Sequence, residues 1–379
     1  MGISAARAAA FDILMLVERG GYASDLLASR TGGMDARDAG LASEIVMGVL
    51  RYQAQLDFLI TKISGRSRFD PEVRLALRMG VYQLRHLERV PAHAAVGESV
   101  ALVKRARKTS AAGLVNAVLR KVNREAVAWP DRATELSHPE WLLERWDRQY
   151  GAGIADRIAR ANLNPPETWV RITDAPHSEA VLEAGDVPGA YKLVSGSAEG
   201  LRIQDIGSQA VVPLLDLEPG QTLLDLCAAP GNKTAQALES GVRAVACDLH
   251  WSRLSRLRAT GCERVVLDGT QPLPFRHTFD RILVDAPCSG TGTLRRNPEI
   301  KWRLTPDDIA DLHARQTRLV RNALERLKPG GKLVYSTCSL EREENEGVLE
   351  VLGLCAARTM ARIPGVTPGD GFFAAVVQD

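Results

Sequence analysis

RILVDAPCSGTGTLRRNPEIKW, residues 281–302, is the stretch that decides the fold of this chain. Residues 282–284 form an apolar run of the kind that fills a strand buried on both faces. Pro287 ends that strand because it has no backbone N–H to donate. Asp285 and Cys288 therefore lie at the carboxyl end of a buried strand, where open α/β sheets bind their ligands. Taken alone, these residues are explained equally well by a buried cysteine beside a solvated charged loop. The interpretation as a ligand site therefore depends on the rest of the chain.

The chain around this stretch has the pattern of a parallel sheet. From about residue 200 onward, short apolar runs alternate with helical periodicity. The longest helix expected there, residues 306–327, has Thr305 as N-cap, Asp308 three residues later and Pro329 as its stop. We therefore predict a Rossmann-like α/β domain over residues 201–379. Its five clearest strands are residues 222–226, 244–247, 264–267, 279–284 and 332–336.

Length and charge set the frame for the rest. With 379 residues the chain is too long for one ordinary core, and we expect two or three domains. Lys and Arg together number 48 against 46 Asp and Glu, which gives a net charge of +2. That balance by itself predicts no nucleic-acid partner, so such a partner has to be inferred from local clustering of charge.

The cysteines indicate a reducing compartment. All six are scattered without a C-x-x-C pair, which argues against a zinc site and against a disulfide framework. The apolar N-terminal stretch is interrupted by Arg7, Asp12 and Glu18, so it is neither a signal peptide nor a membrane span. We expect a cytoplasmic monomer that binds no metal and no membrane.

Residues 1–125 show helical periodicity throughout. Leu41, Ile45 and Val49 form one apolar stripe at four-residue spacing. Glycine and proline breaks between the periodic segments predict the short loops of a compact all-α bundle. The expected helices are residues 7–19, 36–61, 71–88, 93–108 and 111–124.

The end of this bundle is basic. A cluster of cations between residues 100 and 125 is opposed there only by Glu125, and by itself it is typical of a solvated face. The segment HAAVGESVALVKRARKTSAAGLVNAVLRKV, residues 93–122, resembles the C-terminal half of the NusB family of RNA-binding antitermination factors. That resemblance implies a helical RNA-docking domain over residues 1–125. The cations are Lys104, Arg105, Arg107, Lys108, Arg120, Lys121 and Arg124.

Residues 126–200 mix helical and strand patterns. Helices are expected from Pro139 to Tyr150 and over residues 154–161, and strands over residues 168–172 and near residues 191–194. We predict a small α+β connector subdomain for this part of the chain.

The loop DLCAAPGNKT, residues 225–234, follows the first strand of the α/β domain and opens a helix. Its small residues let backbone N–H groups approach a ligand that carries a carboxylate or a phosphate. It is not a P-loop, because Cys227 and Asn232 occupy the positions where that motif needs glycine. The sequence also lacks the G-x-G-x-x-G pattern of dinucleotide sites.

Carboxylates follow four successive strands of this domain. Asp225, Asp248, Asp268 and Asp285 each stand at the end of an expected strand. The second is placed where a Rossmann-like sheet puts the acid that binds a ribose diol. A rim of acids would repel a pyrophosphate, so the pattern favours an adenosine-containing sulfonium cofactor over a dinucleotide.

A second thiol, Cys338, ends the fifth strand beside the strand that ends near Cys288. Two thiols and a carboxylate near a methyl donor suit one chemistry. Carbon 5 of cytosine is a poor nucleophile until a thiolate adds at carbon 6. An acid near N3 stabilises that adduct, and a base must later remove the C5 proton.

Four motifs together resemble the NOL1/NOP2/Sun family of RNA cytosine-C5 methyltransferases. With the NusB-like front, nearly the whole chain outside about residues 165–195 is similar to the Sun/RsmB branch, which methylates 16S ribosomal RNA. The motifs are DLCAAPGNKT, DAPCSGTGTLRRNPEIKW, LKPGGKLVYSTCSL with the following Glu344-Asn345-Glu346, and PGDGFF.

The resemblance assigns roles to individual residues. It implies Cys338 as the nucleophile, Cys288 as an aid to proton removal and product release, and Asp285 as a contact to both cofactor and base. The cofactor would be S-adenosylmethionine and the partner ribosomal RNA. The residues implied to hold the cofactor are Cys227, Ala228, Ala229, Pro230, Gly231, Asn232 and Lys233, with Asp248, Asp268 and Asp285.

Three departures from the family pattern stand out. Asn232 replaces the second loop glycine, and we expect it at positive φ, where asparagine is the least costly substitute. Ile206 stands where the family has an acid, and the chain between Glu346 and Asp370 is short, which predicts trimmed last strands.

Two alternative functions stay open: methylation of another RNA target such as tRNA, and a non-catalytic RNA-binding assembly factor. Amine methylation is disfavoured because D-A-P-C replaces the Asn-Pro-Pro-aromatic form.

Overall fold

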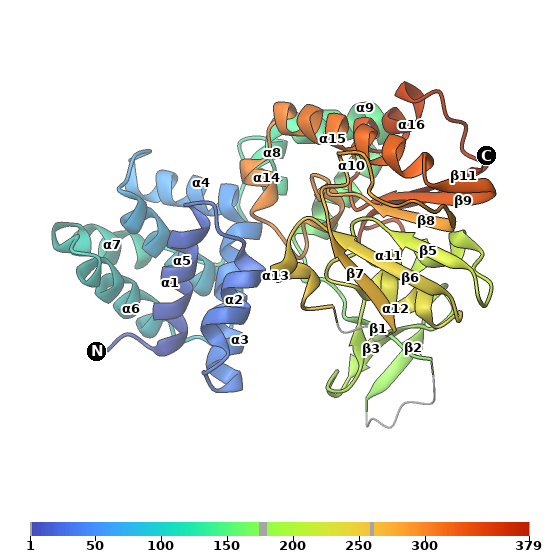
Figure 1. Ribbon diagram of the computed structural model, residues 1–379. Coiled ribbons are helices and arrows are strands. Elements are labelled where there is room, and N and C mark those ends of the chain that lie inside the picture. Colours follow the sequence, from blue (N-terminus) through green and yellow to red (C-terminus); the bar gives the residue numbers. More distant parts are fainter. Residues whose placement is uncertain (1, 174–179, 258–260, 379) are drawn as a thin grey trace. The chain divides into compact units, whose positions relative to one another are not determined.

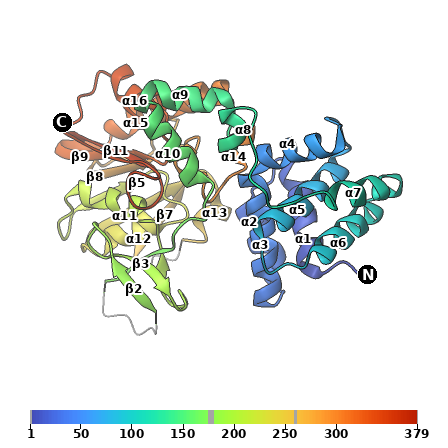
Figure 2. The same cartoon turned by 180° about the vertical axis from the view of Figure 1, so that it is seen from behind.

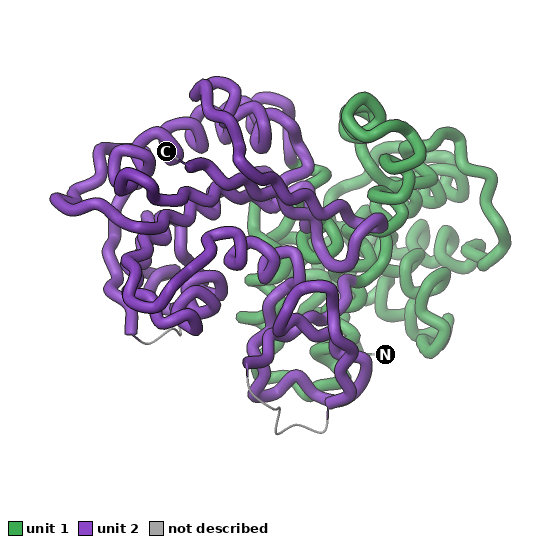
Figure 3. The backbone as a smooth tube through the Cα atoms, turned by 90° about the vertical axis from the view of Figure 1, so that its right-hand side faces the viewer, with its two compact units in different colours: residues 1–165, 294–303 green, residues 166–293, 304–379 purple. Residues whose placement is uncertain are grey.

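The computed structural model describes residues 2–173, 180–257 and 261–378 (Figure 1). The chain forms two compact units (Figure 3). The first contains Met1–Pro165 and Leu294–Arg303, and the second contains Pro166–Thr293 and Leu304–Asp379. Residues 126–165 of the expected connector thus belong to the first unit and its remainder to the second.

The first unit is helical, as the periodicity predicts. The expected helix over residues 36–61 is two helices, because Tyr52 leaves helical geometry between them. A helix at Ala23–Thr31 was not predicted, since only Ala23 and Leu27 of its nine residues are buried. The helices of the bundle are α1 Ala5–Val17, α2 Ala23–Thr31, α3 Ala36–Arg51, α4 Gln53–Ser64, α5 Pro71–His86, α6 Ala92–Arg105 and α7 Ala112–Leu119, followed by α8 Arg132–Leu136, α9 Glu140–Tyr150 and α10 Ala152–Asn162.

The inserted segment Leu294–Arg303, which ends in α14 (Ile300–Arg303), caps helix ends within this unit. Buried Lys301 donates from Nζ to the carbonyl of Arg51 at 2.9 Å, and Trp302 donates from Nε1 to that of Leu50 at 2.8 Å. Both carbonyls belong to the C-terminus of α3, where helix carbonyls lack partners within the helix. Arg303 donates in the same way to the carbonyl of Val17 at the end of α1.

The second unit begins with a small antiparallel sheet of order β2-β3-β1-β4. It lies beside α11 (Ile206–Val211) in the views of Figures 1 and 2. Trp169 and Ala190 of this sheet pack with Ile206, so the residue that replaces the family acid is a core residue. The strands are β1 Trp169–Arg171, β2 Val181–Ala184, β3 Ala190–Ser195 and β4 Arg202–Ile203.

The main sheet has seven strands in the order β10-β11-β9-β8-β5-β6-β7. The five predicted strands run parallel, whereas β10 and β11 are antiparallel, so the sheet is mixed. The expectation that the last strands are trimmed is wrong, because both pair in full register. The strands are β5 Thr222–Asp225, β6 Arg243–Asp248, β7 Cys262–Val266, β8 Phe279–Asp285, β9 Leu327–Thr337, β10 Arg358–Arg362 and β11 Phe372–Gln378.

Helices cover both faces of this sheet. One core contains residues of α15 (Pro306–Leu324) and α16 (Glu346–Val351), and the other contains residues of α11 and α12 (Asn232–Leu238). Thr305 and Asp308 form the predicted capping box, but α15 ends at Leu324 and Pro329 lies within β9. Strand β5 lies between β8 and β6, so the chain order changes direction there and opens a crevice at the carboxyl ends. Within the described ranges, no helix is long and apolar enough to cross a membrane.

Candidate active site at the carboxyl edge of the sheet

The loop after β5 turns sharply into α12 at Gly231. Gly231 has φ +106°, and a Cβ atom there would collide with Leu257, so the position requires glycine. Asn232 is the first residue of α12 and does not have positive φ, so the expectation of a strained asparagine is wrong. Its side chain donates from Nδ2 to the carbonyl of Ile203 at 3.3 Å.

Asp225 is the last residue of β5 and directly precedes this loop. It is buried and accepts a hydrogen bond from Thr234 Oγ1 on Oδ2 at 2.6 Å, while its buried Oδ1 has no partner among the described residues. Burial raises the pKa of Asp225 to about 7. A hollow of about 80 Å³ opens above it, lined by Ser208, Asp225, residues 227–233 and Asp285.

Asp285 at the end of β8 is held by two neighbouring elements. Lys233 Nζ of α12 lies 2.7 Å from its Oδ2, and Ser336 of β9 donates from Oγ to its Oδ1 at 2.8 Å. Lys233 is itself buried and lies over the ring of Phe372, 5.1 Å from the ring centroid. The structure thus brings Lys233 and Asp285, which are 52 residues apart, into one ion pair.

The two remaining acids of the predicted rim lie at the next strand ends, outside the lining of this hollow. Asp248 is buried and accepts from the backbone N–H of His250 on Oδ1 at 3.0 Å. Asp268 is exposed and accepts from the backbone N–H and hydroxyl of Thr270, which lowers its pKa. No cluster of three His, Cys, Asp or Glu residues suited to a metal is found in the described parts of the chain.

The two predicted thiols meet. Cys288 and Cys338 follow the neighbouring parallel strands β8 and β9, and their sulfur atoms are 3.3 Å apart. Both side chains are partly buried. The hydrogen bond with Cys338, together with burial, raises the pKa of Cys288 well above its ordinary value. Cys288 is therefore kept as a neutral thiol beside its partner.

Sequence reasoning missed three residues of this site. Ser336 stands opposite Asp285 in the β8–β9 register, a signal that pairing the two strand ends could have given. Phe372 lies on β11, whose position beside β9 no local pattern predicts. Glu344 belongs to the motif after the fifth strand, but as one acid in a polar run it reads as exposed, whereas it is fully buried.

Comparison with known proteins matches three family models to the chain. The NusB family matches residues 4–124, the RsmF/B-like ferredoxin-like domain matches residues 138–183, and the 16S rRNA methyltransferase RsmB/F family matches residues 212–355. These matches and the structure confirm the predicted fold class: a NusB-like bundle, a small α+β part and a Rossmann-like sheet.

Whole-length relatives agree with these matches. Ribosomal RNA small subunit methyltransferase B of Klebsiella pneumoniae subsp. pneumoniae is 35% identical and covers 96% of this chain and 96% of the relative. The protein of the same name from Citrobacter koseri is 34% identical with the same coverage of both chains. The crystal structure of PH0851 has a TM-score of 0.81 and 23% identity over 100% of both chains, and therefore shares the fold.

Proposed function

Since the chain belongs to the RsmB/F family of 16S rRNA methyltransferases, which use S-adenosylmethionine, we propose that it methylates carbon 5 of a cytosine in 16S ribosomal RNA. The observation that carries this proposal is the sulfur pair of Cys288 and Cys338, 3.3 Å apart, in the segments that follow β8, which ends at Asp285, and β9. Family membership gives an RNA methyltransferase, and the thiol pair supports the cytosine-C5 reaction in particular.

The residues around β5 fit the cofactor. S-adenosylmethionine carries an ammonium group and ribose hydroxyls, and the unpartnered buried Oδ1 of Asp225 is an acceptor for such donors. Residues 227–233, Asp248, Asp268 and Asp285 would hold the remainder. When bound, the cofactor supplies an electrophilic methyl group.

The chain's own residues would activate the base. The Cys338 thiolate forms a bond to carbon 6 of cytosine, and the electrons of the C5–C6 double bond make carbon 5 nucleophilic. Asp285, fixed by Lys233 and Ser336 at the end of β8, would orient the cytosine ring. After carbon 5 gains its methyl group, the proton on carbon 5 passes to a proton acceptor with the help of Cys288. The C–H electrons restore the double bond, and the bond from carbon 6 to sulfur breaks to return the Cys338 thiolate.

The surroundings of the thiols favour this division of roles. A nucleophilic cysteine acts as a thiolate. The hydrogen bond with Cys338 and burial raise the pKa of Cys288, which disfavours a thiolate at Cys288. This supports a role other than nucleophile for Cys288, and we propose Cys338 for the attack.

Bisulfite sequencing of RNA from cells with and without the protein tests the proposal. We expect one 5-methylcytosine of 16S ribosomal RNA to disappear without the protein and to return with the wild-type chain but not with Cys338→Ala. Loss of a 5-methylcytosine from tRNA instead would identify the alternative target. Unchanged methylation in every RNA would leave the assembly-factor alternative.

A further inference from the structure

Glu344 joins the two loops that carry the thiols. It is fully buried, and its carboxylate accepts hydrogen bonds from the backbone N–H of Ser289 at 2.8 Å and from the hydroxyl of Ser289. The same carboxylate accepts from the hydroxyl of Ser339 at 2.5 Å. Ser289 directly follows Cys288, and Ser339 directly follows Cys338. One side chain therefore contacts the residue after each thiol.

Gln316 of α15 extends this link to the other side of Cys288. Its Nε2 donates to the carbonyl of Pro287 at 2.9 Å and to Glu344 Oε1 at 2.9 Å. Pro287 directly precedes Cys288, so the residues on both sides of this thiol are held through Glu344 and its partner.

Asn345 does the same for Cys338. The hydroxyl of Thr337 donates to Asn345 Oδ1 at 2.6 Å, and Asn345 Nδ2 donates to the carbonyl of Ser339 at 3.0 Å. Thr337 and Ser339 flank Cys338. The adjacent residues Glu344 and Asn345 thus hold the backbone next to both sulfur atoms.

We propose that Glu344 is the positioning residue of the thiol pair, because its single carboxylate ties the Cys288 loop to the Cys338 loop and so fixes the sulfur–sulfur distance. This inference rests on the proposed function, in which both thiols act on one cytosine. Displacement of a reacting group by about 1 Å costs about 100-fold in rate, so such a link has direct catalytic value.

The charge of Glu344 acts on Cys288 as well. The hydrogen bonds to its carboxylate described here come from neutral groups: an amide N–H, two hydroxyls and a side-chain amide. The hydrogen bond with Cys338 and burial are larger causes of the raised pKa of Cys288, and this nearby charge raises it further. Glu344 therefore both places the thiols and disfavours the thiolate at Cys288.

Three full-length variants separate position from charge. Glu344→Ala removes both, and Glu344→Gln removes the charge but keeps groups able to hydrogen-bond the two serines. Glu346→Gln, two residues away on the exposed surface, is the matched control. We expect Glu344→Ala to lower kcat about 100-fold with unchanged KM for RNA and cofactor. Glu344→Gln should restore kcat to within about tenfold of wild type, and the control should equal wild type.

The pH dependence of thiol alkylation, located by mass spectrometry, gives a readout that needs neither RNA nor methyl transfer. In Glu344→Gln the midpoint for Cys288 should move to lower pH, while the control stays unchanged. A shifted midpoint would support the role of Glu344 even if no 5-methylcytosine were found, so the two proposals fail separately.

If Glu344→Ala does not fold, Ser339→Ala provides a second test. It removes one hydrogen bond to Glu344 and should lower kcat without changing KM. A wild-type kcat in that variant, or an unshifted midpoint with equal losses in both Glu344 variants, would overturn the proposal.

Discussion

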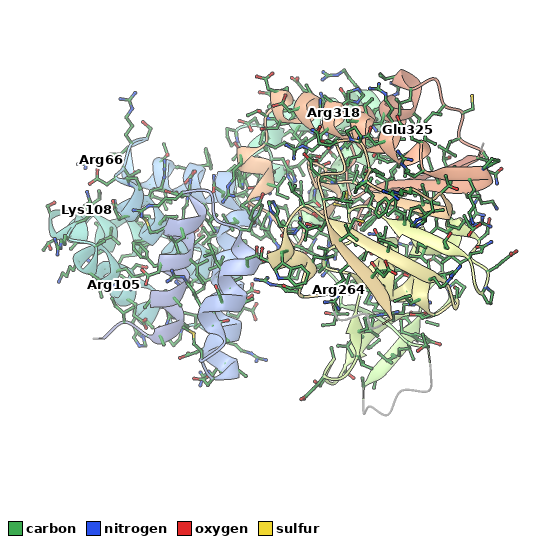
Figure 4. All side chains as sticks on the ribbon, in the orientation of Figure 1. Arg66, Arg105, Lys108, Arg264, Arg318 and Glu325 are labelled. Carbon is green, nitrogen blue, oxygen red and sulfur yellow. The ribbon has the colours of Figure 1, made fainter. Side chains whose placement is uncertain are left out.

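Ion pairs at the sheet edge are more buried than those at the basic end of the helical unit. At the sheet edge, Lys233 and Asp285 are held in fixed contact around a ligand hollow. In the helical unit, Arg105 and Lys108, labelled in Figure 4, pair on the surface with Asp12 and Asp70. This partly buried pair is held in one geometry by further contacts, whereas exposed pairs contribute little each. We therefore expect single changes to have larger effects at the sheet edge than on the helices.

The basic cluster is also smaller than the sequence suggests. Besides the two paired cations, Arg124 donates to the carbonyls of Leu84 and Leu87. Among the described residues, the exposed cations of this cluster that have no side-chain partner are Lys104, Arg107, Arg120 and Lys121.

The largest effect should come from the thiols. Cys338→Ser should abolish methylation and leave no covalent complex, because a hydroxyl is far less nucleophilic than a thiolate. Cys288→Ala should still attack but release product poorly, and so accumulate a protein–RNA adduct that survives denaturing electrophoresis.

The double variant with Cys338→Ser and Cys288→Ala is the control, and it should show no adduct. An adduct in Cys338→Ala that requires Cys288 would make Cys288 the nucleophile. If neither single variant forms an adduct and both retain methylation, the covalent mechanism is ruled out.

A pH experiment tests the buried side of the comparison. The folded pKa of Asp225 is about 7 against an ordinary 3.8, so folding favours its protonated form. Its contribution to stability is present below about pH 4 and is lost as the pH rises to about 7. This loss amounts to about 4 kcal/mol of unfolding free energy. Urea unfolding without cofactor at pH 5 and pH 8 should show about 3 kcal/mol of this decline in wild type and a smaller decline in Asp225→Asn. Equal declines would contradict the assignment.

A smaller effect is expected at Asp248. Asp248→Ala should weaken S-adenosylmethionine binding by roughly 1.5–3 kcal/mol, the range for a hydrogen bond to a charged group. Equilibrium binding of labelled cofactor measures it. The exposed Asp268 provides a graded comparison, since Asp268→Ala should cost less. Unchanged binding in Asp248→Ala would move the ribose contact elsewhere on the edge.

The smallest effects per residue belong to the helical unit. Changing Lys104, Arg107, Arg120 or Lys121 to glutamine should each weaken RNA binding by roughly 0.5 kcal/mol. The fourfold variant should also flatten the salt dependence, because fewer counterions are released. Arg105→Gln with Lys108→Gln is the matched control and should change less. Equal effects of both sets would mean that surface pairing does not mask these cations.

The sequence predicted the features that depend on residues close together in the chain. Apolar runs ended by Asp285-Ala286-Pro287-Cys288 and by Cys338 identified two neighbouring strand ends, and strand pairing then brought the thiols together. Contacts between distant segments were not predictable: Lys233 with Asp285, or Glu344 with both thiol loops. Neither periodicity nor spacing records which distant residue a buried polar group meets.

The decapeptide Leu294–Arg303 has a consequence for how such a protein can be rebuilt. The backbone passes between the units after Pro165, after Thr293 and after Arg303, so no single breakpoint separates them. Recombination at residue 165 would transplant the helices without the segment that caps α1 and α3. It would also leave Lys301 on the other parent without the carbonyl of Arg51 that it contacts. A functional chimera therefore needs the front helices and this decapeptide from the same parent.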